Sequence, residues 1–175
     1  MTLRFQLLLF YPGDWAKESQ LLLSEFSKVK DSLVSSDCLV YGVSSDSVHS
    51  HQEWLADTSF SPAFPLISDP AALLAYKYGI YSAEEEGEEQ EQEKVVELPP
   101  CRCIVITDNQ SVMLELVSSS FSVEELVAYT QERLAMLLQK RRMAVDRARN
   151  RERQEVVDHS RLHIQRKLGE FRTYI

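Results

Sequence analysis

Cysteine and histidine are the side chains of this sequence whose spacing could support redox or metal chemistry. Cys101 and Cys103 form a C-x-C pair, and His49 and His51 form a second pair with the same spacing. Alternate residues of a strand point to one face, so the two thiols could form a redox pair or half of a metal site. C-x-C is less specific than the C-x-x-C spacing of zinc sites and thiol oxidoreductases. We therefore expect neither a metal nor a cofactor, and keep Cys101 and Cys103 as redox candidates.

A second group of residues that could bind a ligand or partner is an arginine-rich run near the C-terminus. Its basic residues are Lys140, Arg141, Arg142, Arg147, Arg149, Arg151 and Arg153. Acidic residues are interspersed, and no aromatic side chain is available for stacking on bases. This composition favours a protein partner over nucleic acid, which is kept as an alternative for this segment.

The arginine run belongs to a long segment of helix-forming residues. No proline or glycine occurs from Ser122 to Leu168, and Ser122 with Glu125 has the spacing of a capping box. Residues 1–130 carry 7 basic and 21 acidic side chains, whereas 131–175 carry 12 basic and 6 acidic ones, so the net charge changes from −14 to +6. We expect a domain over 1–138 and a basic helical extension over 139–175. Apolar residues return late in the extension, and the predicted partner-binding set is Arg147, Arg149, Arg151, Arg153, Leu162, Leu168 and Phe171.

The first 138 residues alternate between apolar strands and amphipathic helices. Strands are predicted over 3–10, 39–43, 64–67, 102–107 and 112–117, and helices over 15–33, 48–56 and 71–78. Asp69 is the predicted N-cap of the last of these helices, with Pro70 at its first position. Residues 82–97 hold eight glutamates and one lysine, which predicts an inserted acidic surface loop. This order predicts an α/β fold with a mixed sheet flanked by helices, followed by a long C-terminal helix.

The location expected for this chain is inside the cell, most simply the cytoplasm. No apolar run approaches the ~20 residues that cross a membrane, and the N-terminal segment lacks the features of a signal peptide. Three cysteines without a secretory signal are typical of free thiols in a reducing compartment. The sequence leaves the oligomeric state open.

Six short motifs, in order and at compatible spacings, resemble those of the typical two-cysteine peroxiredoxins. They are Phe10-Tyr-Pro-Gly-Asp14, Gly42-Val-Ser-Ser-Asp-Ser47, His51-Gln-Glu-Trp54, Phe64-Pro-Leu-Ile-Ser-Asp69, Tyr78-Gly-Ile80 and Arg102-Cys-Ile-Val-Ile-Thr-Asp108. The resemblance covers about residues 5–135 and implies the thioredoxin-like fold of that family.

The chain departs from this family at the residues that carry its peroxidase chemistry. The family uses Pro-x-x-x-Thr-x-x-Cys together with a distant arginine; here the corresponding residues are Pro12, Ala16, Ser19 and Arg102. A serine hydroxyl cannot pass through the sulfenic acid on which the cysteine chemistry depends. The C-terminal resolving cysteine is absent as well, since no cysteine follows Cys103. We therefore interpret these four residues as a vestigial pocket in a catalytically inactive relative that binds a protein partner. A thiol peroxidase that uses Cys101 or Cys103 is the alternative.

Overall fold

The computed structural model describes residues 5–80, 103–118 and 121–172. The chain divides into two compact units, Met1–Gln131 and Glu132–Ile175. The predicted acidic loop over 82–97, together with Cys101 and Arg102, lies outside the described residues. The described elements are β1 (Phe5–Phe10), α1 (Lys17–Ser35), β2 (Cys38–Ser44), α2 (Val48–Asp57), β3 (Leu66–Ser68), α3 (Leu73–Lys77), β4 (Cys103–Thr107), β5 (Met113–Ser118) and α4 (Val123–Arg172).

The five described strands form one mixed sheet in the order β3-β2-β1-β4-β5. β1 and β2 are parallel, as are β2 and β3, whereas β4 runs antiparallel to β1 and β5 antiparallel to β4. The two strands predicted over 102–107 and 112–117 form an antiparallel hairpin as β4 and β5. Its turn is held by the Asp108 carboxylate, which accepts hydrogen bonds from the backbone N–H groups of Gln110 and Val112. The predicted mixed α/β sheet is therefore confirmed.

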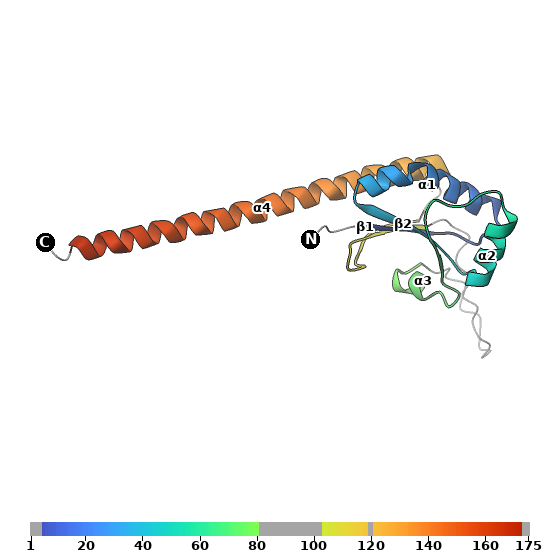
Figure 1. Cartoon of the computed structure of the whole chain (residues 1–175), viewed down its shortest axis with the longest axis horizontal. Coiled ribbons are helices and arrows are strands. Elements are labelled where there is room, and N and C mark those ends of the chain that lie inside the picture. Colours follow the sequence, from blue (N-terminus) through green and yellow to red (C-terminus); the bar gives the residue numbers. More distant parts are fainter. Residues whose placement is uncertain (1–4, 81–102, 119–120, 173–175) are drawn as a thin grey trace. The chain divides into compact units, whose positions relative to one another are not determined.

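The sheet is covered on both faces because its central strands are apolar on both sides. Leu8 and Phe10 of β1 pack with Ala75 and Tyr78 on the face covered by α3. Leu7 and Leu9 alternate to the opposite face, where α1 lies (Figure 1). α1 supplies a buried stripe to this face: Leu22, Leu23, Phe26 and Leu33. The carboxyl ends of β1 and β2 thus meet at one edge of a layered core, with α1 and α2 beginning there.

Helix starts follow local capping chemistry where a polar side chain is available. The predicted capping box of α4 is confirmed: the Ser122 N–H donates to Glu125 Oε2 at 2.9 Å, and the Glu125 N–H donates to Ser122 Oγ at 3.2 Å. The prediction for Asp69 was wrong, because α3 begins only at Leu73, after Ala72 in a left-handed conformation with φ of 51°. Asp69 still caps this segment, since its carboxylate accepts from the N–H groups of Leu73, Leu74 and Ala75.

The long helix expected at the C-terminus is confirmed as α4, with 50 residues. Its first turns belong to the first unit, where Val123 and Leu126 are buried. In the second unit, every side chain from Arg142 to Leu162 is exposed. None of the described helices is both long and apolar enough to cross a membrane.

Candidate functional site

The segment between β1 and α1 carries three of the four residues predicted to form a vestigial pocket. Pro12 is half-buried, and Ala16 is the N-cap residue of α1, where its methyl group makes no capping hydrogen bond. Ser19 lies in the first turn of α1 and is fully buried. The fourth residue, Arg102, lies outside the described residues.

The Ser19 hydroxyl has no polar partner among the described residues. A serine becomes a nucleophile only when a base accepts its proton at hydrogen-bond distance, and no such base is present in the described part of the chain. An unpaired buried hydroxyl instead lowers stability, because it loses its hydrogen bonds to water without replacement. The geometry around Ser19 is therefore that of a packed residue.

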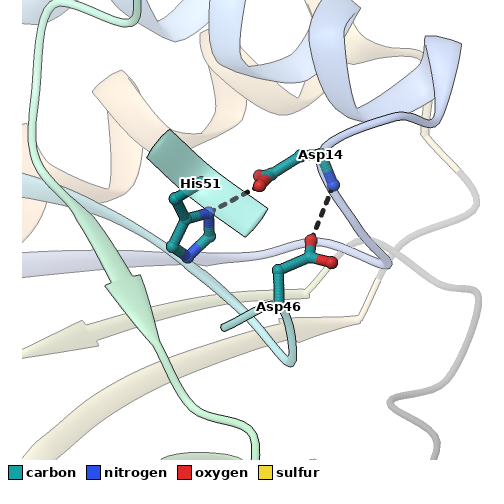
Figure 2. A group of neighbouring side chains, drawn as sticks. All are labelled: Asp14, Asp46 and His51. Carbon is teal, nitrogen blue, oxygen red and sulfur yellow. Dashed lines mark hydrogen bonds and ion pairs between the residues drawn. The ribbon is translucent and has the colours of Figure 1, made fainter. Parts of the chain in front are cut away.

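A buried polar cluster stands immediately beside this segment. Asp14 follows β1, Asp46 follows β2, and His51 comes from the first turn of α2 (Figure 2). His51 Nδ1 lies 2.6 Å from Asp14 Oδ2, and the Tyr11 hydroxyl donates to Asp14 Oδ1 at 2.9 Å. The backbone N–H of Asp14 donates to Asp46 Oδ2 at 2.8 Å. These contacts connect the loops after two neighbouring parallel strands.

Burial dominates the electrostatics of this cluster. It raises the pKa of the Asp14 carboxyl, while the hydrogen bonds from Tyr11 and His51 and the nearby His51 charge lower that pKa in part. Burial, the Asp14 charge and the hydrogen bond to Asp14 also raise the pKa of the Tyr11 hydroxyl far above its usual value. Tyr11 therefore keeps its proton and donates a hydrogen bond to Asp14, whose other oxygen lies against the His51 ring.

Asp14, Asp46 and His51 bring three atoms of metal-ligand type within 4.8 Å of one another. Two ligands of a tetrahedral zinc ion, each at 2.0–2.1 Å, lie about 3.3 Å apart. Asp14 and His51 are closer than this and contact each other directly, and Asp46 Oδ2 already accepts from the Asp14 N–H and Ser44 Oγ. This geometry fits a hydrogen-bonded pair better than a metal centre.

The cluster also lacks a nucleophile. Within the described part of the chain, His51 Nε2 is buried without a hydrogen-bond partner, as is Ser19 Oγ, so the two atoms are not bonded to each other. A Ser-His-Asp triad requires that contact at about 2.6–3.2 Å. Asp14 and His51 therefore orient one imidazole ring without activating a serine.

Of the two redox candidates, the structure describes Cys103 but not Cys101. Cys103 begins β4 and is buried opposite Phe10, while Cys101 lies outside the described residues. Cys38, at the start of β2, is buried, and this burial together with the Asp37 charge raises the pKa of its thiol to about 12. Since the thiolate is the reactive form, this burial disfavours reaction of Cys38 at neutral pH.

The predicted partner-binding residues all belong to α4. Arg147, Arg149, Arg151, Arg153 and Leu162 are exposed. The side chains of Leu168 and Phe171 are not among those described. The arginines fall at alternate positions of a helix, so they are distributed around it and do not form a single stripe.

The Asp14–His51 pair was missed in the sequence, although both residues belong to motifs noted there. The two residues are 37 positions apart, and no local spacing relates them. The available indication was topological: the loops that follow two adjacent parallel strands meet at one edge of the sheet. The sequence was considered only for the spacing of His51 from His49, whereas in the structure His51 is held by Asp14.

The fold and this strand-end site define a protein of the thioredoxin-like class with a peroxiredoxin-type first unit. The model of the AhpC/TSA family matches residues 4–114, and the chain belongs to this family. A putative peroxiredoxin of Entamoeba histolytica is 37% identical over 86 residues, which cover 46% of this chain and 37% of that protein. The match therefore spans well under half of that relative.

Solved structures show the same fold at low sequence identity. The bacterioferritin comigratory protein of Xanthomonas campestris superposes with a TM-score of 0.62 at 21% identity, covering 77% of this chain and 80% of that one. AhpC of Mycobacterium tuberculosis gives a TM-score of 0.60 at 24% identity, covering 77% and 69%. At this identity the likeness establishes the fold alone.

Proposed function

We propose that this AhpC/TSA-family chain does not reduce peroxides and that it acts as a protein-binding subunit through its basic helical extension, residues 139–175. The observation that carries the first part is Ser19. It stands where the family resemblance places the peroxide-attacking cysteine, and it is fully buried without a base or any other polar partner among the described residues. Ala16 adds no hydroxyl at the neighbouring threonine position.

The support for partner binding comes from the exposed part of α4. A solvated helix retains few apolar side chains unless another surface covers them. Here Val156, Val157, Leu162 and Ile164 are all more than half exposed. The flanking arginines supply positive charge, which favours a partner with an acidic surface.

Peroxide consumption by the purified chain, with thioredoxin and with glutathione recycling, tests the first part. We expect the rate of the no-protein blank for the wild-type chain and for Cys103→Ser. A rate well above the blank that Cys103→Ser or Cys101→Ser abolishes would contradict the proposal and support a thiol peroxidase.

Capture of partners from native extract tests the second part. The triple variant Leu162→Ser, Leu168→Ser, Phe171→Ser should lose the proteins that the wild-type chain retains. A matched triple variant with exposed apolar residues of the first unit replaced, Leu21→Ser, Leu73→Ser and Tyr76→Ser, should keep them. Equal capture by both triple variants and the wild type would place the binding surface elsewhere. Retention on immobilised mixed-sequence RNA, lost with rising salt, would instead support the nucleic-acid alternative.

A further inference from the structure

One face of the exposed stretch of α4 carries arginines followed by apolar side chains. Arg149, Arg153 and Val157 are spaced four residues apart, and Ile164 follows seven residues later, so all four lie on the same side of the helix. Val157 and Ile164 are 57% and 58% exposed, and both arginines are exposed. At a rise of ~1.5 Å per residue, Val157 and Ile164 lie about 10.5 Å apart along the axis. This face therefore offers two apolar contacts with positive charge at its N-terminal end.

A matching pair of apolar side chains lies on α2 of the first unit. Val48 and Leu55 are also seven residues apart, and they are 62% and 39% exposed. Both border a hollow of about 220 Å³, whose lining also includes Pro62, Phe64 and Pro65 of the segment that leads into β3. A cavity of about 150 Å³ accommodates a benzene ring, so this hollow has room for one branched aliphatic side chain. The equal spacing allows a second helix to contact both residues of α2.

The surroundings of α2 favour a positively charged partner. From residue 31 to residue 76 the sequence contains six acidic side chains and no lysine or arginine. α2 ends at the exposed Asp57, and Leu55 lies in its last turn, which contains no basic side chain. The helix dipole and the carboxylate both favour a cation at this end. An arginine of the partner is therefore best placed beside the last turn of α2.

We propose that α4 of one copy of this chain binds α2 of a second copy, with the two helices antiparallel. Val157 then meets Leu55 at the hollow, and Ile164 meets Val48. This direction places Arg153, one turn before Val157, at the end of α2 that favours a cation. The contact rests on the function proposed above, in which α4 binds a protein, and makes that protein a second copy of the chain.

Charge favours this contact over the pairing of two α4 helices. Residues 1–130 carry a net charge of −14 and residues 131–175 one of +6. The α4 of one copy and the first unit of another therefore attract each other, whereas two α4 helices repel. The contact uses different surfaces on the two copies, so it either closes a ring or extends a chain. Few side chains take part, so association is weak and increases with concentration.

Sedimentation equilibrium of the full chain over a range of concentrations tests this contact. The average mass should rise with concentration, and less steeply at high salt. Leu55→Asp and Val157→Asp should each stay monomeric, because a carboxylate replaces an apolar side chain at the contact. Matched controls at comparably exposed positions of α1 and α4, Leu21→Asp and Met143→Asp, should associate like the wild type.

Mixing the two defective variants separates this contact from other forms of association. Leu55→Asp retains the α4 surface and Val157→Asp retains the α2 surface, so the mixture should form a one-to-one pair that neither variant forms alone. The charge reversals Asp57→Arg and Arg153→Asp should each weaken association about tenfold, and the chain that carries both should recover it.

Three results would overturn the proposal: a wild-type chain that stays monomeric at every concentration, self-association that both aspartate variants retain, or a mixture without the one-to-one pair. A monomeric chain that still captures proteins from native extract through α4 would leave the function proposed above in place. A monomeric chain that captures none would contradict both.

Discussion

The buried contact between His51 and Asp14 should be among the largest single contributions to the stability of the first unit. His51→Ala removes the ring that lies 2.6 Å from the Asp14 carboxylate and leaves that carboxylate fully buried. Breaking a buried ion pair from one side typically costs about 3–5 kcal/mol. Tyr11 continues to donate to Asp14, so we expect about 3 kcal/mol, the lower end of this range.

A double-mutant cycle separates the pair from ordinary cavity effects. Asp14→Ala leaves the Tyr11 hydroxyl and His51 Nδ1 without an acceptor, at about 1–3 kcal/mol for each group. In the double variant neither partner is left charged and unpaired, so its loss should be smaller than the sum of the single losses by about 2 kcal/mol or more.

Urea unfolding followed by tryptophan fluorescence measures these losses. Trp54 is fully buried on α2, three residues after His51, and reports unfolding of this region. His49→Ala is the matched control, because His49 contacts Glu53 at 3.3 Å with both side chains largely exposed. A surface pair of this kind contributes at most ~1 kcal/mol.

The pH dependence provides an independent check with a definite sign. Burial raises the folded-state pKa of Asp14 above its unfolded value of 3.8. The folded chain therefore binds the Asp14 proton more tightly than the unfolded chain does. The stability that this proton binding contributes is complete below the unfolded pKa and is lost as pH rises through the folded pKa. His51→Ala removes interactions that lower this pKa, so the Asp14 pKa should be higher still in the variant. The loss in free energy of unfolding relative to wild type should therefore shrink as the solution is acidified.

Either of two results would refute this reasoning. The first is a loss in His51→Ala no larger than that in His49→Ala. The second is strict additivity in the cycle, which would mean that the two side chains are stabilised by their separate surroundings.

Three further predictions concern single positions. Ser19→Ala should leave the free energy of unfolding unchanged or raise it by up to about 1 kcal/mol, since it removes an unpaired buried hydroxyl; a loss above about 1 kcal/mol in urea unfolding would show a hidden partner. Gly42→Ala should cost about 1–3 kcal/mol in the same assay, because the new Cβ would lie 2.7 Å from Leu66 Cδ2 and 3.1 Å from Tyr11 Cε1; a neutral result would mean that both neighbours yield. Cys38 should resist iodoacetamide in the native chain near neutral pH and react in urea, as peptide mass spectrometry would show, because burial raises its pKa to about 12; fast native labelling would contradict this.

Local sequence patterns predicted those features of the fold that depend on residues close together in the chain. Ser122 and Glu125 cap α4 reciprocally, as their spacing indicates, and Asp108 holds the hairpin turn. The start of α3 was predicted wrongly because Ala72 adopts a left-handed conformation, which no propensity of alanine suggests. In α1, Leu22 and Leu23 are both buried while Leu21 is exposed, a distinction that the range predicted for this helix does not make.

The candidate site was harder to predict, because it depends on contacts between distant residues. The identity of Ser19 could be read directly, but its burial and unpaired hydroxyl could not. Asp14 and His51 meet only because β1 and β2 are parallel neighbours whose following loops share one edge. That relation is a property of strand order, which residue types alone do not specify.

The length of α4 determines which spectroscopic signals can report on this protein. It contains 50 residues, against 19, 10 and 5 in α1, α2 and α3, so α4 produces most of the ellipticity at 222 nm that the described helices contribute. The stretch from Arg142 to Leu162 has no buried side chain, and such a helix melts gradually rather than in one cooperative step. A thermal scan by circular dichroism would therefore slope broadly and resemble a multistate transition, even where the first unit unfolds in two states. Calorimetry, or tryptophan emission, which comes from Trp15 and Trp54 of the first unit, would recover the cooperative unfolding that the ellipticity obscures.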